Sequence, residues 1–323
     1  MKLKFIILLL LLVVFFATDV LLGSITIEPS EIFVHGSITN TLLFNFRIPK
    51  ATTALVAGAA LSASGLMMQT IFRNPLAGPH ILGVSSGASL GVALFMLGSP
   101  LLGLGYIREL GIAFSAWVGA ATVLLVVMTV SARLKNIMTV LILGMMFGSA
   151  TSAFVDVLQY FSNDTALKGF VIWAMGSLGG VSTPQLSILA GSTIVGLLLA
   201  IWAVKPLNLL LLGENYARTM GLNVRLTRTI IFSSTALLAG GVTAFCGPIA
   251  FIGIAVPHIA RMIFREANHR ILLPASVLTG MVLMLACDII ASLPGSNTVL
   301  PINTITSLIG IPVVVMILWR GNR

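Results

Sequence analysis

Ten runs of apolar residues, most of them about 20 residues long, constrain the fold of this chain more than any other feature. They lie at about 5–22, 51–71, 81–103, 110–130, 137–161, 184–204, 229–246, 249–264, 271–291 and 300–319. A helix of roughly 20 apolar residues is long enough to cross the hydrocarbon core of a bilayer. The composition agrees, because 58% of the residues are hydrophobic and only 8% are charged. We therefore expect an all-α polytopic membrane protein in which residues 1–323 form a single transmembrane domain.

The first apolar run follows Lys2 and Lys4 and extends to Leu22. A basic start followed by an apolar run is also typical of a cleaved signal peptide. The run is nevertheless about 18 residues long, which is enough to span a bilayer. No Ala-x-Ala cleavage motif follows it. We therefore expect this segment to be retained as the first span.

The basic residues predict an orientation. If the N-terminus is inside and ten spans alternate, 14 of the 18 Lys and Arg residues fall in inside segments. The four that remain outside are Arg47, Lys50, Arg108 and Lys168. Cytoplasmic loops of membrane proteins carry an excess of Lys and Arg. We therefore expect both termini, and the polar segment before residue 229, to lie in the cytoplasm.

That polar segment, Pro206 to Arg228, is the longest polar interruption in the second half of the chain. Glu214 precedes Arg218 by four residues, the favourable order for a helical ion pair, and Gly221 is typical of a helix end. A helix from Glu214 to Met220 would have Asn215 and Thr219 on its polar side and Tyr216, Ala217 and Met220 on its apolar side. We therefore predict a short amphipathic surface helix, held between two spans, that contacts a partner.

Several kinds of chemistry have no sequence signal. No Gly-Lys dipeptide occurs, so there is no phosphate-binding loop of the P-loop ATPases. No HExxH motif is present, and the four histidines are dispersed. Gly83-Val84-Ser85-Ser86-Gly87 has the GxSxG form of a nucleophile elbow, but it lies inside an apolar run, where its glycines and serines are expected to allow close helix packing. Cys246 and Cys287 lie in apolar runs without a CxxC spacing, so they predict neither a metal site nor a disulfide framework. Although the net charge is +9, the basic residues are scattered at span ends, which argues against nucleic-acid binding. We expect neither an enzyme nor a metal centre.

Asp156 and Asp288 lie well inside the fifth and ninth apolar runs. A charged side chain in a span costs roughly 2.5–3.5 kcal/mol on insertion scales, so such residues are candidates for proton coupling. The alternative is that each lies near the outer end of its span and is satisfied by water or a helix terminus. We favour the alternative because no second intramembrane acid or base accompanies either residue.

A faint internal repeat is also present. Ala57-Gly58 and Gly65 recur 182 residues later as Ala239-Gly240 and Gly247, and a Pro-His-Ile follows each set. In the predicted topology the two copies run in opposite directions, as in the inverted repeats of transporters. Small residues also recur wherever membrane helices pack closely, so the repeat alone leaves both interpretations open.

Five stretches together carry a resemblance to a known family. They are Arg47-Ile48-Pro49-Lys50 with AGAALSASGLMMQTIFRNPLAGPHILGVSSGAS (57–89), LLGENYARTMGLNV (211–224), CGPIAFIGIAVPHIARMI (246–263), HRILLPAS (269–276) and LPINTITSLIGIPVVVMIL (300–318). In order and spacing they resemble the FecCD-type permeases of ATP-binding cassette (ABC) importers for iron-siderophores, haem and cobalamin. The resemblance covers nearly the whole chain from about residue 45.

The resemblance implies a type II ABC importer permease with ten spans and an inverted internal repeat. Such a subunit works in a bacterial cytoplasmic (inner) membrane as a homodimer or heterodimer, here expected to be a homodimer. It implies three further partners: an ABC ATPase subunit, an extracytoplasmic substrate-binding protein and membrane lipid. ATP would bind to the ATPase subunit, and this chain would hold no cofactor.

The resemblance also assigns residues. The segment at about 207–222 would be the coupling helix, with Glu214, Asn215, Tyr216, Ala217, Arg218, Met220 and Gly221 seated against the ATPase. Arg47 and Lys50 would contact acidic residues of the binding protein, where exposed cations steer and register a partner. Asn136 and Ile137 correspond to the inner gate. Ser292 stands where the family often has a basic residue, so one docking contact could be lost.

Together these features predict the permease subunit of an ABC importer that moves an iron chelate (siderophore), haem or cobalamin, with iron-siderophore as the first expectation. The competing class is a proton-coupled secondary carrier that uses Asp156 or Asp288.

Overall fold

A computed structural model describes residues 1–22, 38–98, 109–131, 134, 137–292 and 299–321. Within these residues the chain forms helices and no strands. In the described part of the chain, seven spans are long and apolar enough to cross a membrane. They are α1 (Lys2–Leu21), the continuous α2 (Ile38–Leu42), η2 (Leu43–Arg47) and α3 (Ile48–Phe72), α6 (Glu109–Ser131), α7 (Ile137–Phe161), α9 (Thr183–Trp202), the continuous α12 (Val224–Thr235), η4 (Ala236–Gly240) and α13 (Gly241–Cys246), and α15 (His269–Ala291).

The described residues also form three shorter apolar helices: α4 (Val84–Met96), α14 (Ile252–Phe264) and α16 (Ile302–Gly321). The ten apolar helices correspond in order to the ten predicted spans. The connecting elements are η3 (Pro79–Leu82), α8 (Asp164–Ala174), α10 (Val204–Leu211) and α11 (Glu214–Thr219). The prediction of an all-α polytopic membrane protein is confirmed.

Two of the predicted spans are broken near their starts. Gly83 has φ of +71°, which ends η3 and lets α4 begin at Val84. Phe251 has φ of +66°, so α14 begins only at Ile252. The extended backbone before α14 is satisfied within the protein, because the Ala250 amide donates to Asn303 Oδ1 at 3.0 Å. Irregular backbone at membrane depth needs such internal partners, since lipid supplies none.

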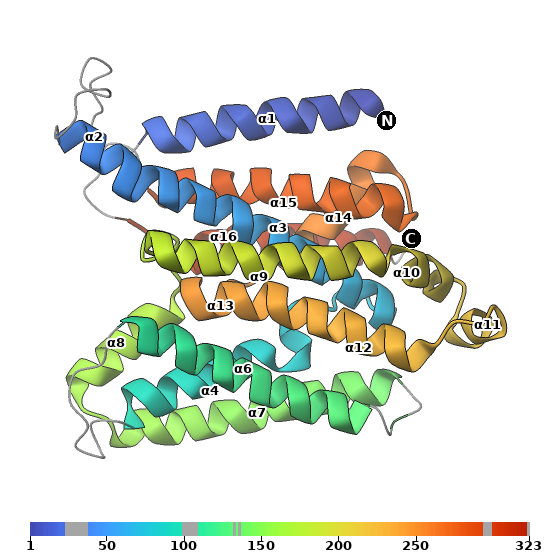
Figure 1. The fold of residues 1–323 in the computed structure, drawn as a ribbon, viewed down its shortest axis with the longest axis horizontal. Helices are drawn as coiled ribbons and strands as arrows, with labels where there is room; N and C mark the ends of the chain where they lie inside the picture. Colours follow the sequence, from blue (N-terminus) through green and yellow to red (C-terminus); the bar gives the residue numbers. More distant parts are fainter. Residues whose placement is uncertain (23–37, 99–108, 132–133, 135–136, 293–298, 322–323) are drawn as a thin grey trace.

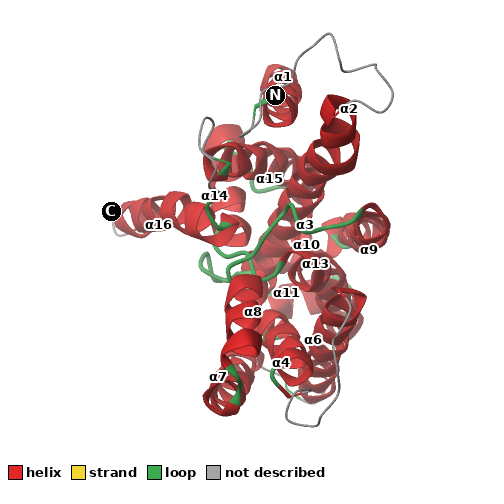
Figure 2. Ribbon diagram, turned by 90° about the vertical axis from the view of Figure 1, so that its left-hand side faces the viewer, coloured by secondary structure: helices red, strands yellow, loops and turns green. Residues whose placement is uncertain are grey.

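The long helices lie side by side, and α3 runs through the middle of the bundle (Figures 1 and 2). α3 packs against α14 and α15, while α4, α6 and α7 pack together on one side. α1 begins and α16 finishes at the end of the molecule where α11 projects (Figure 1). We call this the α11 end. The even number of apolar helices accounts for both termini lying there.

Glycines set the close contacts of α3. A Cβ at Gly65 would overlap the backbone of Gly253 in α14, and one at Gly58 would overlap Gly280 in α15. Lipid is as apolar as the core, so membrane helices associate through close packing of small residues. The glycines of the first repeat copy therefore have a packing role.

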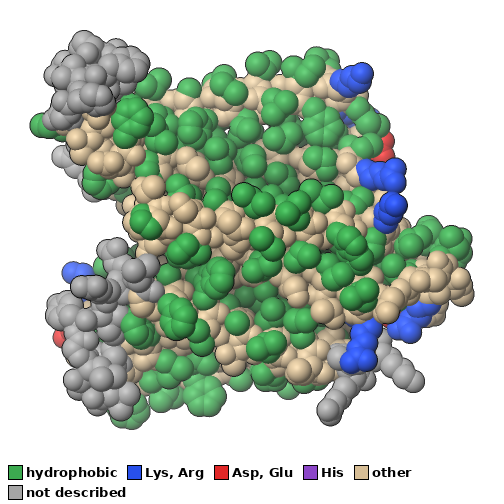
Figure 3. Space-filling model, viewed as in Figure 1, with side chains coloured by type: hydrophobic (Ala, Val, Ile, Leu, Met, Phe, Trp, Pro, Cys, Tyr) green, Lys and Arg blue, Asp and Glu red, His purple; other side chains and the backbone are tan. Residues whose placement is uncertain are grey.

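On the outside of the bundle, large apolar side chains of α1, α6, α7 and α9 are exposed, as expected for a surface that contacts lipid (Figure 3).

Candidate functional site

α11 is the short helix predicted from the sequence. Arg218 Nη2 donates to Glu214 Oε1 at 2.7 Å, so the predicted ion pair is present. The helix ends at Thr219, and Gly221, which follows the cap residue Met220, has a φ of +82° and donates its amide to the Arg218 carbonyl at 3.0 Å. The next amide, that of Leu222, donates to the Ala217 carbonyl, also at 3.0 Å. These two bonds satisfy carbonyls that a helix end would otherwise leave unpaired.

A second arginine holds α11 on the bundle. Arg228 of α12 is 7% exposed, and its Nη2 donates to Glu214 Oε2 at 2.9 Å. Its Nη1 donates to the carbonyl of Leu134, between α6 and α7, at 3.1 Å. The planar guanidinium suits this task because its donors point in fixed, divergent directions. Sequence reasoning missed Arg228, since a separation of 14 residues across a turn gives no periodic signal.

These contacts affect the ionisation of Glu214. Partial burial would raise the pKa of the carboxyl, but the hydrogen bond from Arg218 and the contacts with Arg228 outweigh it and lower the pKa below its usual range. Glu214 is therefore a carboxylate at neutral pH, held between two guanidinium groups. The ion pair between Glu214 and Arg228 fixes the position of α11 relative to α12.

The predicted apolar side of α11 is divided in the structure. Ala217 is fully buried against the bundle, whereas Tyr216 and Met220 are 51% and 59% exposed. Leu211 and Leu212, just before α11, are also exposed. We call Leu211, Leu212, Tyr216 and Met220 the apolar tip. Figure 3 shows apolar side chains beside lysines and arginines at the α11 end.

A cavity of about 230 Å³ lies between α11 and the spans. Glu214 and Arg228 line one part of it, and Ile137 and Met138 at the start of α7 line another. Ile137, one of the two predicted gate residues, is therefore adjacent to the base of α11. Asn136, the other, lies outside the described residues.

The predicted docking cations lie at the end opposite α11, and both have partners in this chain. Arg47 Nη1 donates to the carbonyls of Val20 and Leu21 at 3.2 and 2.8 Å. Lys50 Nζ lies 2.9 Å from Asp288 Oδ1 and donates to Ser292 Oγ at 2.6 Å. Ser292, which departs from the family pattern, thus contacts one of the predicted docking residues.

The expectation that no other charged group accompanies Asp288 is wrong. The Asp288 side chain is only 3% exposed, and it pairs with Lys50 of α3. Asp19 of α1, 7% exposed, lies within electrostatic reach of Lys50, Asp288 and Arg47. Its position inside the first apolar run was a signal that sequence reasoning overlooked. These charged residues come together because α1, α3 and α15 pack against one another. The three helices are far apart in the sequence, so the sequence alone does not reveal the contact.

Asp156 has a different setting, in an open groove of about 580 Å³ along α7. The groove is lined by His80, Ile81, Ser86, Gly144, Met145, Gly148, Ser149, Ser152, Ala153 and Asp156. His80 Nδ1 lies 2.8 Å from Ser85 Oγ, so the imidazole, which η3 carries, already contacts α4. Small and hydroxyl-bearing side chains give the groove a wall that can accept a polar solute. Among the described residues, no three His, Cys, Asp or Glu side chains form a metal site.

Comparisons with known proteins agree with this arrangement. The model of the FecCD transport family matches residues 9–320. The vitamin B12 import system permease protein BtuC of Citrobacter koseri is 34% identical over 281 residues, which cover 87% of this chain and 84% of the relative. BtuC of Escherichia coli strain K12 / DH10B is 34% identical over 302 residues, covering 93% and 90%.

Solved structures share the fold. An inward-facing metal-chelate type ABC transporter matches with a TM-score of 0.86 and 31% identity, covering 99% of each chain. PsaBC from Streptococcus pneumoniae matches with a TM-score of 0.54 and 18% identity, covering 86% of this chain and 92% of that one, which shows a likeness of fold alone. A family model that spans almost the whole chain, together with ten apolar helices in the expected order, identifies the protein as a member of the FecCD transport family.

Proposed function

We propose that this chain is the permease subunit of an ABC importer that moves a metal chelate, haem or cobalamin across the bacterial cytoplasmic membrane. The observation that carries the proposal is α11 with its apolar tip. Tyr216 and Met220 are exposed on α11, which projects from the bundle at an end rich in Lys and Arg (Figures 1 and 3). Exposed apolar groups rimmed by polar ones mark protein interaction sites.

The partner on the apolar tip is an ABC ATPase, which binds the ATP that this chain has no motif to bind. α11 is suited to the role because Glu214, clamped by Arg218 and Arg228, keeps the helix rigid on the bundle. Glu214 and Arg218 therefore position the helix, while the apolar tip supplies contact area. Asn215 and Gly221 belong to the same surface.

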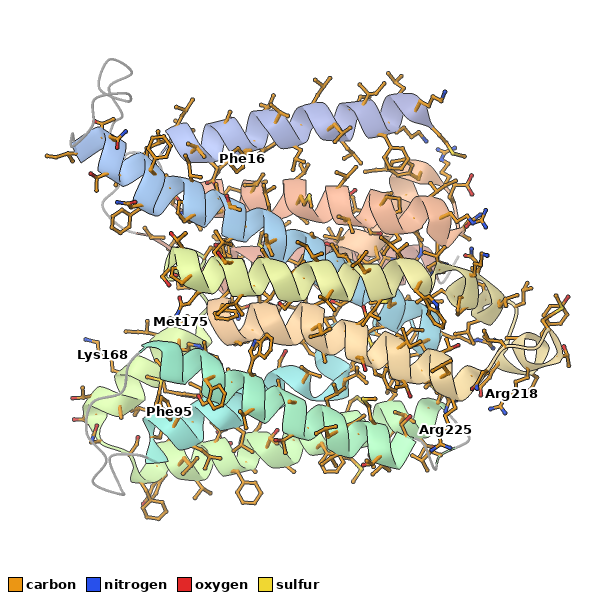
Figure 4. All side chains as sticks on the ribbon, in the orientation of Figure 1. Phe16, Phe95, Lys168, Met175, Arg218 and Arg225 are labelled. Atoms are coloured by element: carbon orange, nitrogen blue, oxygen red, sulfur yellow. The ribbon has the colours of Figure 1, made fainter. Side chains whose placement is uncertain are left out.

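The test is co-purification of the permease with an ATPase, scored by ATP hydrolysis of the purified complex. Because Tyr216 and Met220 make no internal ion pair, Tyr216→Glu with Met220→Glu changes the surface without disturbing Glu214. We expect the double variant to reduce ATPase recovery about tenfold, as loss of central apolar contacts does in other interfaces. Lys168→Glu is the control, since Lys168 is exposed at the opposite end (Figure 4).

Charge reversal tests the clamp separately. Glu214→Arg would place three arginines together, and Arg218→Glu would leave Glu214 paired with Arg228 alone. We expect Glu214→Arg to detach α11 from α12 and to reduce ATPase recovery strongly. Arg218→Glu should reduce ATPase recovery less. Undiminished recovery with all of these variants would show that α11 is an ordinary interfacial loop.

The substrate is proposed as a class: iron-siderophore, haem or cobalamin. The relatives named above import vitamin B12, and the structural match is of the metal-chelate type. The hydroxyl groups of Ser149 and Ser152 in the groove along α7 support a substrate that carries polar groups. Proteoliposomes that contain the ATPase and a binding protein, tested with cyanocobalamin, haemin and ferrichrome, separate the three.

The remaining assignments follow from the same proposal. A second permease copy, expected to be identical, would complete the pathway, and Asn136 and Ile137 would form its inner gate. Arg47 and Lys50 would dock the binding protein, although each must exchange contacts that it already makes within the chain.

A proton-coupled carrier is the second candidate, because Asp156 lines the groove and, among the described residues, has no basic partner. Asp288 is a poorer candidate, since Lys50 pairs with it. Uptake by the chain alone, driven by a proton gradient without ATPase, would favour the carrier.

A further inference from the structure

A chain of polar contacts joins α10, the helix before α11, to α15 and α3. Asn208 of α10 lies at its centre. Its Oδ1 accepts from the backbone amide of His269 at 2.9 Å and lies 2.8 Å from His269 Nδ1. Its Nδ2 donates to Asn268 Oδ1 at 2.9 Å. The other ring nitrogen, His269 Nε2, lies 2.8 Å from Thr70 Oγ1 of α3. One imidazole therefore connects three helices.

The donors and acceptors along this chain are determined. A backbone amide can only donate, so the Asn208 atom facing His269 must be its oxygen. His269 Nδ1 faces the same oxygen and must therefore carry a hydrogen. The Thr70 hydroxyl lies 2.8 Å from Nε2 and 2.9 Å from the Leu66 carbonyl, and it has one hydrogen to give. In the neutral ring Nε2 carries no hydrogen, so the hydroxyl hydrogen must point to Nε2 if two lone pairs are not to face each other. The ring has one arrangement that satisfies both neighbours, which makes the connection directional and rigid.

Burial makes these bonds consequential. His269 is 1% exposed and Thr70 is 5% exposed. A buried polar group that loses its partner retains the full cost of desolvation, so the three helices resist separation at this point. A neighbouring contact acts in the same direction, because Arg73 Nη2 at the end of α3 donates to the Leu210 carbonyl of α10 at 3.2 Å.

α3 leads from this junction to the groove. Thr70 lies in its last turn, and the chain continues through residues 73–78 to η3, whose His80 and Ile81 line the groove along α7. The glycine contacts with α14 and α15 leave α3 little freedom to move alone. A displacement of α10 therefore reaches the groove wall together with α3 and α15.

We propose that Asn208, His269 and Thr70 form a joint that transmits movement of α11 into the α3–α15 core. The three are positioning residues, and the inference rests on the proposed role of α11 as the contact for an ATPase. Without the joint, the ATPase would still bind the apolar tip and hydrolyse ATP, but the groove would no longer respond.

The experiment uses the permease–ATPase complex in nanodiscs and needs no transported substrate. The buried cysteines Cys246 and Cys287 are replaced by alanine, and Ser152→Cys places a reporter in the groove. The readouts are ATPase recovery, ATP hydrolysis and the rate of maleimide labelling at position 152, with and without ATP and vanadate. Thr70→Val removes the hydroxyl with little change in shape, and Thr70→Ser restores it.

Thr53→Val is a matched control. Thr53 lies on the same helix and is also buried, and its hydroxyl contacts the carbonyl four residues earlier, that of Pro49, at 2.8 Å, as Thr70 contacts that of Leu66 at 2.9 Å. Of these two hydroxyls, the Thr70 hydroxyl is the one that also contacts His269. We expect Thr70→Val to shrink the ATP-dependent change in labelling about fivefold, the effect of one lost hydrogen bond on an equilibrium. Asn208→Leu should abolish the change. ATPase recovery should stay the same in both, and Thr70→Ser and Thr53→Val should behave as the parent.

Three outcomes would overturn the joint while leaving the proposed function intact. One is an undiminished labelling change in both Thr70→Val and Asn208→Leu. Another is an equal loss in Thr53→Val, which would indicate general weakening of α3. The third is recovery of an active ATPase with no ATP-dependent labelling change in the parent. A parent that recovers no ATPase would instead remove the proposed function, and the joint with it.

Discussion

The charged residues at the end opposite α11 are held by partners from different helices. Lys50 contacts Asp288 and Ser292, and Asp19 lies beside them. An isolated charge in an apolar environment costs several kcal/mol, whereas a paired and hydrogen-bonded one is tolerated. The cluster therefore ties α1, α3 and α15 together where the spans finish. It explains why an aspartate stands within the apolar α15.

Removing the cation from this cluster should be more harmful than removing the pair. Lys50→Met leaves the Asp288 carboxylate buried without its partner, and we expect a loss of stability on the order of 3 kcal/mol. The double variant Lys50→Met with Asp288→Leu removes both charges and should regain part of the lost stability. Thermal unfolding in detergent, followed by tryptophan fluorescence, ranks the stabilities of the wild type, the single variant and the double variant. Lys168→Met, at an exposed site, is the control. A double variant less stable than Lys50→Met would contradict the pairing.

The clamp on Glu214 predicts a pH dependence for α11. Because the pKa of Glu214 is lowered from its usual 4.5 in the folded protein, its contribution is complete above 4.5 and is lost as the pH falls through the lower, folded value. A spin label at the exposed Asn215→Cys should therefore report an ordered helix from pH 8 to 5 and a mobile one in more acidic solution. With Glu214→Gln the label should be equally mobile at every pH. A wild-type transition above pH 5 would assign the ordering to another group.

At the scale of helices, α3 depends on close approach rather than on large side chains. Its contact with α14 is made backbone to backbone at Gly65 and Gly253, so no side chain fits between them. Gly191 in α9 offers a contrast, because nothing lies within 4 Å of the position that its Cβ would occupy. The same substitution at the two sites separates close packing from the intrinsic helix preference of alanine.

We expect Gly65→Ala to prevent correct folding, because its Cβ would overlap a backbone carbonyl that cannot move without displacing α14. Gly191→Ala should be neutral or stabilising by up to about 1 kcal/mol, since alanine favours a helix over glycine. Size-exclusion chromatography of fluorescently tagged protein and thermal stability in detergent provide the measurements. A well-folded Gly65→Ala protein would show that α3 and α14 can separate at little cost.

Patterns within one helix allowed prediction from the sequence, and contacts between distant helices did not. The apolar runs define the spans, and the spacing of Glu214 and Arg218 predicts their ion pair. The breaks at Gly83 and Phe251 are set by backbone conformation and were not foreseen. Lys50 and Ser292 are 242 positions apart, and Thr70 and His269 are 199 apart. Such pairs arise from packing, and a single sequence has no periodicity that reveals them.

At the scale of the whole molecule, charge and topology are consistent. Most Lys and Arg side chains visible in Figure 3 lie at the α11 end, and Arg218 and Arg225 lie there in Figure 4, whereas Lys168 lies at the other end. The helices bearing the two termini also reach the α11 end. The excess of basic residues in cytoplasmic segments predicts that this end faces the cytoplasm. Only that orientation gives a cytoplasmic ATPase access to α11.

Labelling of single cysteines tests the orientation directly. In a background without Cys246 and Cys287, we expect Asn215→Cys to react with a membrane-impermeant maleimide only in inverted vesicles. Lys168→Cys should react in intact spheroplasts, because Lys168 and α11 lie at opposite ends of the bundle (Figure 4). Both positions are exposed, so a failure to react reflects the side of the membrane rather than burial. Reaction of Asn215→Cys in intact spheroplasts would reverse the topology. The apolar tip would then face away from any source of ATP, and the ATPase interface proposed for it could not form.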